Sequence, residues 1–413
     1  MRVLLTCGPV YSHFAPMVAP VAEAIREAGH EVAVATGPSL AGDLDRLGLP
    51  YLSLPRMLTG LQRAADPDQA RRLGLIPEEM AKPVTGAMFG RLFAGEVALQ
   101  SAKDLLAVAS EFQPDLVVRE NAELGAYLFA EKVGVPCVTL DTAAMARSRH
   151  ADVLPVLNKS RMALGLRPVP DTATLVAYPW VSWLPASWYP AELHRRAHRH
   201  NRAPDQATET LDPAIAGLPA DRPFVLAALG TNTGVLAHGK LPLPEMVEAF
   251  GALPVTAVVA LGSDAALAEG TGPRPDNVRL ASFAQQRLLL PSCDLFITHA
   301  GFGSVQETLT PGVPTVALPQ RTDQPANAQR LADLGPGITL AQDQVDTATL
   351  TAACRRVLED SSYRHATRGF QRQILGLHGI DELMADLNAL VGQIPRRQPH
   401  RDPGEDADAV ATT

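Results

Sequence analysis

The sequence predicts an α/β protein built from two doubly wound domains. Short apolar runs typical of buried parallel strands alternate with amphipathic helical patterns, and this alternation begins at residue 2 and begins again at residue 224. The chain has 413 residues, enough for two or three domains. Its 46% hydrophobic and 19% charged residues are typical of a globular protein with sizeable cores.

The first half of the chain alternates strand and helix patterns from its start. The expected strands are 2–6, 31–35, 51–54, 115–118 and 136–140, and the expected helices are 16–28, 41–47, 98–112 and 123–133. Residues 8–14 should form a loop, and residues 56–100 are irregular, with apolar side chains that look exposed. All three tryptophans fall within residues 178–190, where they either pack the end of the first domain, which we favour, or form an aromatic wall for an apolar ligand.

The second half repeats the pattern and ends in a long helical stretch. The expected strands are 224–229, 255–261, 278–280, 295–298 and 315–318, and the last helical stretch is 346–391. Composition shifts divide the chain into a first domain, a polar and Pro-rich linker, a second domain, a final helix and a disordered tail, at 1–205, 206–222, 223–375, 376–395 and 396–413. The final helix is expected to pack back on the first domain.

Residues 294–324 combine a strand, a glycine turn and a helix start. The apolar run 295–297 predicts a buried strand, and Gly301 and Gly303 then allow a tight turn. Ser304 is a plausible N-cap because Glu307 follows three residues later, as in a capping box. A helix N-terminus after such a turn offers unpaired N–H groups, which suit a phosphate.

Polar side chains follow the two strands that flank this helix. His299 stands at the carboxyl end of the first strand, where a nitrogen donor can reach the same phosphate. Asp323 and Gln324 follow the next strand and open onto the same crevice. A carboxylate beside an amide is well suited to sugar hydroxyls, because the amide both donates and accepts hydrogen bonds.

The ordered combination H-x-G-x-G-S-x-x-E, P-G-V-P and P-x-x-x-D-Q resembles the donor-binding signature of nucleotide-sugar-dependent glycosyltransferases with the GT-B fold. The resemblance is to the family 1 type, which includes bacterial natural-product and antibiotic glycosyltransferases. It implies two Rossmann-like domains facing across a cleft, with the acceptor on the first domain and the donor on the second. It also implies an inverting displacement at the anomeric carbon, with a nucleoside-diphosphate sugar (a dTDP-deoxysugar or a UDP-hexose) as co-substrate.

The resemblance assigns the donor contacts residue by residue. His299 and the amides of the glycine turn would hold the pyrophosphate, helped by a second phosphate turn. Phe283 and Gln286 would hold the base, Glu307 the ribose, and Asp323 and Gln324 the sugar. The full predicted donor set is Gly230, Thr231, Phe283, Gln286, His299, Gly301, Phe302, Gly303, Ser304, Glu307, Asp323 and Gln324.

His13 and Glu120 are the predicted catalytic residues. In the resembled family a histidine in the first loop deprotonates the acceptor hydroxyl, and here Ser12-His13-Phe14 occupies that place. A neutral imidazole is a suitable base near neutral pH, more so when a carboxylate holds its other nitrogen. The family usually carries an aspartate after the strand at 114–118, whereas this chain has Glu120, one methylene longer.

The acceptor is expected to be a small apolar natural product such as a polyketide. Its predicted contacts are Phe14, Met57, Met88 and Phe89. No cofactor and no metal are expected, because His299 and the helix N-terminus can stabilise the leaving diphosphate. The D-x-D pairs at residues 43–45 and 66–68 are interpreted as solvated surface.

Composition argues against several other classes of partner. A net charge of −8 disfavours binding to nucleic acid or an anionic membrane surface. No C-x-x-C pair suggests a zinc site, and no apolar run approaches the ~20 residues of a membrane helix. The start of the chain resembles a first strand rather than a signal peptide, so a cytoplasmic protein is expected. A homodimer is left open.

Three alternatives remain at this stage. A GT-B nucleotide-sugar epimerase would place catalytic carboxylates in the cleft and would have little use for the apolar segment 56–100. A non-catalytic nucleotide-sugar-binding relative is disfavoured by the presence of His13 and of Asp323-Gln324. A cell-wall or sterol glycosyltransferase would usually present a basic or apolar membrane-facing patch, which the acidic balance disfavours.

Overall fold

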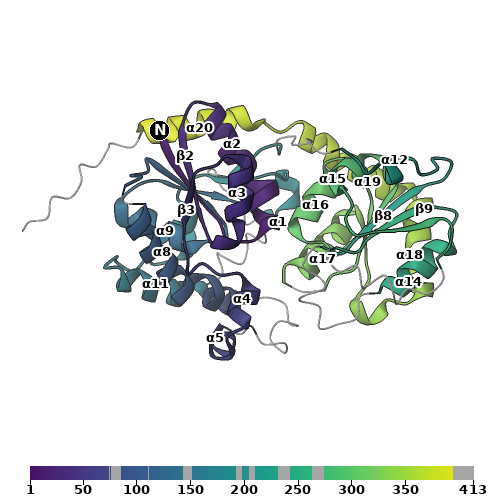
Figure 1. Ribbon diagram of the computed structural model, residues 1–413, viewed down its shortest axis with the longest axis horizontal. Helices are drawn as coiled ribbons and strands as arrows, with labels where there is room; N and C mark the ends of the chain where they lie inside the picture. The colour runs from purple at the N-terminus through teal and green to yellow at the C-terminus, as the bar shows by residue number, and fades with distance from the viewer. Residues whose placement is uncertain are drawn as a thin grey trace, which may run out of the picture.

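The computed structural model has two lobes, each a parallel β-sheet with helices on both faces (Figure 1). This confirms the predicted fold class. The structure describes residues 1–73, 75, 85–109, 111–142, 151–191, 198–203, 210–230, 242–262, 274–320 and 322–393. Thr231 and the tail 396–413 lie outside the described residues, as does part of the predicted linker.

The first sheet has seven parallel strands in the order β3-β2-β1-β4-β5-β6-β7. Alternate residues of β1 enter different cores: Val3 and Leu5 pack with the helix α2, while Leu4 packs with the helices α8 and α9. The sheet is therefore buried on both faces, which is why its strands are almost continuously apolar. The strands are β1 (Arg2–Thr6), β2 (Glu31–Thr36), β3 (Tyr51–Ser53), β4 (Leu116–Glu120), β5 (Cys137–Leu140), β6 (Trp180–Ser182) and β7 (His198–His200).

The second sheet has six parallel strands in the order β10-β9-β8-β11-β12-β13. Val225 packs on the face covered by α14 and α18, and Leu226 on the face of α12 and α15. The strands are β8 (Phe224–Ala228), β9 (Thr256–Ala260), β10 (Val278–Ala281), β11 (Leu295–Thr298), β12 (Thr315–Ala317) and β13 (Gly337–Thr339).

The helices connect these strands and fill the faces of both sheets. The first lobe contains α1 (Tyr11–His13), η1 (Phe14–Val18), α2 (Ala19–Glu27), η2 (Pro38–Leu40), α3 (Ala41–Leu47), α4 (Gly60–Ala64), α5 (Pro67–Leu73), α7 (Gly86–Phe89), η3 (Gly90–Ala94), α8 (Glu96–Val108), α9 (Leu124–Val133), α11 (Val153–Ala163), η4 (Thr172–Val176) and η5 (Ala186–Trp188). The rest of the chain contains α12 (Pro213–Ala216), α14 (Leu243–Gly251), α15 (Gln286–Leu289), η8 (Leu290–Ser292), α16 (Phe302–Leu309), α17 (Gln324–Leu334), η9 (Gln342–Gln344), α18 (Thr347–Glu359), α19 (Ser361–Leu375) and α20 (Ile380–Gln393).

The first helical segment begins earlier than the sequence predicts. The expected loop 8–14 is helical from Tyr11, so His13 belongs to α1. A π-helical turn, η1, follows and contains Pro16. Proline has no N–H to donate to the carbonyl four residues earlier, which is the signal that led to a later predicted start. The wider π turn accommodates the proline, and π turns often occur at functional sites.

Three of the apolar residues expected to be exposed in segment 56–100 are buried. Met57, Met88 and Phe89 are each no more than 6% exposed, and Met57 and Phe89 belong to a core beside α8 and α9. The tryptophans Trp180 and Trp183 are buried as well, at 3% and 1% exposure. Packing of the first lobe is thus the better of the two interpretations of the tryptophan segment.

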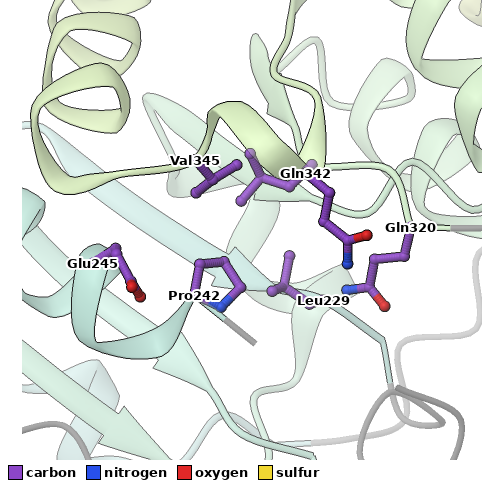
Figure 2. A pocket seen from close by; sticks show the side chains of 7 residues that line it. Leu229, Pro242, Glu245, Gln320, Gln342 and Val345 are labelled. Carbon is purple, nitrogen blue, oxygen red and sulfur yellow. The ribbon is translucent and has the colours of Figure 1, made fainter. Parts of the chain in front are cut away.

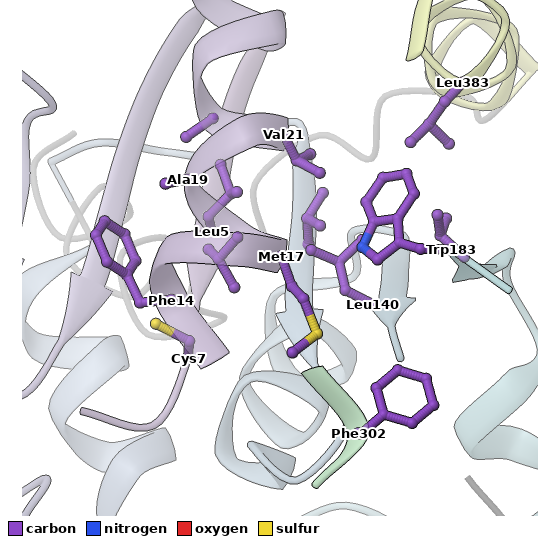
Figure 3. Packing of buried hydrophobic residues seen from close by; sticks show 14 of the residues in the cluster. Leu5, Cys7, Phe14, Met17, Ala19, Val21, Leu140, Trp183, Phe302 and Leu383 are labelled. Atoms are coloured by element: carbon purple, nitrogen blue, oxygen red, sulfur yellow. The ribbon is translucent and has the colours of Figure 1, made fainter. Parts of the chain in front are cut away.

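One apolar core joins the two lobes. Phe302, the first residue of α16 in the second lobe, lies beside Met17 and Leu140 of the first lobe (Figure 3). Leu383 of α20 lies near Trp183 in the same cluster, and α20 packs on α2 (Figures 1 and 3). The returning C-terminal helix therefore belongs physically to the first lobe.

Hydrogen bonds also join segments that are far apart in the sequence. Arg330 of α17 donates to the carbonyls of Trp188 and Ser187, at 2.8 and 3.0 Å. Asn201, which follows β7, forms a parallel bridge with His378, the residue preceding α20 by two. Asn201 Nδ2 also donates to the Gly379 carbonyl at 3.0 Å. The two chain segments that connect the lobes are therefore bonded side by side.

Candidate active site

Three neighbouring strands of the first sheet bring polar residues to one edge. The chain leaves β1 into the turn that leads to α1 and His13, β4 ends at Glu120, and Thr142 follows β5 by two residues. Parallel strands present their carboxyl ends at the same edge, where α/β proteins bind ligands. The topology therefore places these three residues together.

The Glu120 carboxylate is held by three donors. His13 Nδ1 lies 2.8 Å from Oε1, Thr142 Oγ1 donates to Oε1 at 3.0 Å, and the Gly8 N–H donates to Oε2 at 2.8 Å. The Glu120 side chain is 2% exposed, whereas that of His13 is 31% exposed. The imidazole thus turns one nitrogen to a buried carboxylate while the ring keeps access to solvent.

The charges of this pair stabilise each other. Burial lowers the pKa of His13, but the charge and hydrogen bond of Glu120, with a further contribution from Asp323, raise it above its ordinary value. Burial raises the pKa of Glu120, but His13, Gly8 and Thr142 together hold it below its ordinary value. An ionised carboxylate only accepts hydrogen bonds, so His13 must carry its proton on Nδ1, which leaves Nε2 available as a base.

In the second lobe, His299 is packed between two glycines. A Cβ atom at Gly301 would lie 2.6 Å from His299 Nε2, and one at Gly230 would lie 3.1 Å from the same atom. Gly230 also has φ +95°, a left-handed conformation that favours glycine. Both glycines are therefore required for the imidazole to lie against the turn that starts α16. These three predicted donor residues are brought together.

The predicted capping box at Ser304 is wrong. The helix begins at Phe302 with Gly301 as its N-cap, so Ser304 lies inside its first turn. Glu307 instead accepts a hydrogen bond from Gln286 Nε2, with Arg287 at 3.9 Å. Burial raises the pKa of Glu307 although Arg287 and Gln286 oppose the shift. The contact places two predicted nucleoside-binding residues next to each other.

Asp323 and Gln324 lie at the start of α17, close to the same turn. Asp323 Oδ2 accepts from the Phe302 N–H at 3.2 Å, so an amide predicted to meet the pyrophosphate is bonded to this carboxylate in the structure. Gln324 Oε1 accepts from the Gln320 N–H at 2.9 Å. The predicted sugar-binding pair is thus adjacent to the predicted phosphate site.

Asn327 is a member of this network that the sequence analysis missed. Its Nδ2 donates to Asp323 Oδ2 at 2.8 Å and to the Ala300 carbonyl at 3.0 Å. Ala300 has φ +60°, so the amide holds a turn in a conformation unusual for alanine. The available signal was spacing, because Asn327 follows Asp323 by four residues and so lies on the same face of α17.

The two lobes approach each other at these residues. A Cβ atom at Gly303 would lie 3.9 Å from the Ser12 carbonyl oxygen, so the first turn of α16 faces the His13 segment. The charge of Asp323 contributes to the raised pKa of His13 across the same boundary. The predicted base and the predicted donor site therefore share one region.

The remaining predicted residues are placed less favourably. Phe283, just before α15, is 58% exposed and free to present its ring to a ligand. Phe14, Met57, Met88 and Phe89 are buried, so their predicted role as an open acceptor surface is not supported by their positions.

In the described part of the chain, no group of three or more His, Cys, Asp or Glu residues could hold a metal ion. Likewise, none of the described helices is long and apolar enough to cross a membrane.

A cavity lies at the same edge of the second sheet, on the side of α14 (Figure 2). None of its lining residues is a predicted site residue. Leu229 precedes Gly230, and Gln320 is bonded to Gln324, so the cavity borders the predicted donor site without containing it. It is lined by Leu229, Pro242, Glu245, Leu318, Gln320, Gln342 and Val345.

The chain matches a known family model and is similar to curated proteins over most of its length. Residues 245–390 match the family model "Erythromycin biosynthesis protein CIII-like, C-terminal domain". The chain is 30% identical over 377 residues to L-demethylnoviosyl transferase of Streptomyces niveus, covering 89% of this chain and 92% of the relative. It is 27% identical over 408 residues to tylactone mycaminosyltransferase of Streptomyces fradiae, covering 91% of this chain and 89% of the relative.

Solved structures share the fold. The glycosyltransferase VinC, in complex with dTDP, matches with a TM-score of 0.75 at 22% identity, covering 95% of this chain and all of that chain. Spinosyn rhamnosyltransferase SpnG, complexed with thymidine diphosphate, matches with a TM-score of 0.73 at 22% identity, covering 94% of this chain and all of that chain. The two-lobed arrangement is therefore that of the GT-B enzymes.

Proposed function

The chain belongs to the natural-product glycosyltransferases, and from this premise we propose that it transfers a sugar from a nucleoside-diphosphate sugar to an apolar natural product. The sugar is attached to a hydroxyl of the acceptor with inversion at the anomeric carbon. His13 is the base. The carrying observation is the 2.8 Å contact between His13 Nδ1 and the buried Glu120 carboxylate. It lies where the first lobe faces the start of α16.

The first step is removal of the acceptor proton. The acceptor hydroxyl donates to His13 Nε2, and its oxygen attacks the anomeric carbon as the proton moves to the imidazole. Glu120 stabilises the resulting imidazolium, because the carboxylate stays ionised next to it. The raised pKa of His13 makes its neutral imidazole a stronger base.

The second part is departure of the nucleoside diphosphate. His299 and the N–H groups at the start of α16 would stabilise the negative charge that develops on the leaving phosphate. With the anomeric carbon attacked from the side opposite the leaving group, its configuration inverts. These contacts supply positive charge without a metal, so metal-independent transfer is part of the proposal.

The donor is proposed to be a dTDP-sugar rather than a UDP-sugar. Two solved relatives of the same fold are described with bound dTDP, and the curated relatives transfer mycaminosyl and L-demethylnoviosyl groups. Thermal shift with dTDP and UDP at equal concentrations tests this choice, because the ligand that binds more tightly raises Tm more. A larger shift with UDP would reverse the preference.

His13→Ala tests the base. The variant should keep the Tm shift caused by dTDP, because His13 lies on the other lobe, and should lose transfer by about 10²-fold to 10⁴-fold. Transfer is measured with dTDP-glucose and UDP-glucose as donors and 4-methylumbelliferone as an aryl hydroxyl acceptor. Wild-type turnover by the His13→Ala enzyme would contradict the proposed role of His13 as the base.

Gly301→Ala tests the donor site. The added Cβ would lie 2.6 Å from His299 Nε2, so the imidazole must move and the dTDP-induced Tm shift should shrink. Gly369→Ala in α19 is the matched control, because nothing lies within 4 Å of its Cβ. The control should be stabilised by about 0.5–1 kcal/mol and bind dTDP normally. Equal binding by both variants would place the nucleotide elsewhere.

A further inference from the structure

Glu120 needs more restraint than a shorter carboxylate would. Glutamate has one more rotatable bond than aspartate, so more conformations must be excluded before its oxygens face His13. The Gly8 N–H fixes Oε2, but Oε1 is the atom that contacts the imidazole. Its position depends on what else binds it.

Thr142 supplies the second restraint on Oε1. Its Oγ1 donates to that atom at 3.0 Å, and its residue is 1% exposed, so water does not compete for the bond. Among the described residues, Thr142 is the hydroxyl that donates to this carboxylate. The bond also helps to keep the pKa of Glu120 below its ordinary value, after the larger effects of burial and of His13.

We propose that Thr142 is a positioning residue of the transfer reaction, whose hydroxyl fixes the Glu120 carboxylate so that His13 is held as the Nδ1–H tautomer with Nε2 facing the acceptor. In this role Thr142 acts through Glu120 and neither gains nor loses a proton. The inference rests on the proposed function, since it gives the threonine a role only if His13 is the base.

The test compares Thr142→Val with Thr139→Val. Valine keeps the shape of threonine and removes the hydroxyl. Thr139 is three residues upstream in β5, is also 1% exposed, and its hydroxyl has no hydrogen-bond partner among the described residues. Thr142→Ser restores the donor, and Thr142→Ala removes the hydroxyl with less bulk should valine disturb the fold.

The first readout is the tautomer of His13, from imidazole ¹⁵N shifts above neutral pH, with the His13→Ala spectrum identifying the signal. Wild type, Thr142→Ser and Thr139→Val should show the Nδ1–H form. Thr142→Val should show a mixture with the Nε2–H form. This measurement needs no substrate.

The second readout is transfer to 4-methylumbelliferone. For Thr142→Val, kcat should fall about tenfold to a hundredfold, the range for a hydrogen bond to a charged group, with the KM for the donor unchanged. Serine should recover most of the loss. Wild-type kcat together with a pure Nδ1–H tautomer in Thr142→Val would overturn the proposal. Full activity in His13→Ala would instead overturn the proposed mechanism, whatever the threonine variants do.

Discussion

At the scale of single residues, the length of Glu120 decides what the active-site carboxylate can reach. One oxygen accepts from the Gly8 backbone and the other from His13, so a single buried charge holds both the loop after β1 and the imidazole. An aspartate would be shorter by about 1.5 Å and could not keep both contacts without movement of the backbone. Despite the departure from the family's usual aspartate, the contact between the carboxylate and His13 is therefore kept.

Glu120→Gln should separate the charge of this residue from its shape. Burial by itself lowers the pKa of His13, and Glu120 contributes more than Asp323 to raising it, so that pKa should fall in the variant. A base works only when unprotonated, so the acid limb of the kcat/KM profile against pH should move to lower pH. The plateau should fall about 10²-fold to 10⁴-fold.

The control is Glu27→Gln, an exposed glutamate at the end of α2. It should leave both the limb and the plateau unchanged. An acid limb that stays at its wild-type position in Glu120→Gln would show that His13 is not the group titrating in the profile.

At the scale of elements, α16 has two functions at its first turn. Its backbone amides are proposed to bind the diphosphate, and the side chain of Phe302, 4% exposed, packs into the core that joins the lobes. The helix that would bind the leaving group is thus also an anchor between domains. Phe283, 58% exposed, has no such packing role.

Two phenylalanine truncations should separate stability from nucleotide binding. Phe302→Ala should lower the free energy of unfolding by about 3–5 kcal/mol, as for other large core truncations. Phe283→Ala should change stability by less than about 0.5 kcal/mol but weaken dTDP binding by about 1–3 kcal/mol through lost stacking on the base. Urea unfolding and calorimetric titration measure the two effects. A destabilised Phe283→Ala with normal dTDP affinity would contradict both assignments.

The elements also show where sequence reasoning succeeds and where it stops. Strands such as β1, β4 and β11 are apolar on both faces, so periodicity and length identify them. The start of α1 was missed because Pro16 suggested a later beginning, and the cap of α16 because Ser304 and Glu307 have a spacing that also suits other contacts. Short strands such as β6 and β7 depend on pairing partners distant in the sequence, which local patterns do not encode.

The residues of the candidate site also fall into those that sequence motifs indicate and those that only the folded structure shows. The placement of His13, His299 and Asp323 in one region could be predicted, because they belong to ordered motifs. The contact of Thr142 could not, because it comes from strands that meet only in the folded chain. For Asn327 the available signal was its spacing from Asp323. The buried positions of Met57 and Phe89 likewise depend on helices that the composition of the segment did not indicate.

At the scale of the whole molecule, the shared core couples the two lobes. Residues of α2, α16, α19 and α20 belong to one cluster, with Leu383 1% exposed near Trp183. The lobes should therefore unfold together rather than in separate transitions. All three tryptophans lie in the first lobe and belong to the core that it shares with the second, so their fluorescence reports on that lobe and on the shared core.

Leu383→Ala should test the coupling. Loss of this buried side chain should lower the free energy of unfolding by about 2–5 kcal/mol. Leu375→Ala, at the end of α19 and 57% exposed, is the same chemical change and should have an effect below about 0.5 kcal/mol. In both variants the transitions followed by tryptophan fluorescence and by far-UV circular dichroism should coincide. Two separated transitions would mean that the lobes are independent.

The bridge between Asn201 and His378 has a mechanical consequence. The chain passes from the first lobe to the second after Asn201 and returns at His378. These two connecting segments are bonded to each other, so the lobes are joined by a pair of bonded segments. Two bonded segments resist twisting and sliding of one lobe against the other more than they resist bending. Relative movement of the two lobes should therefore be mainly a bending about the line through these two residues.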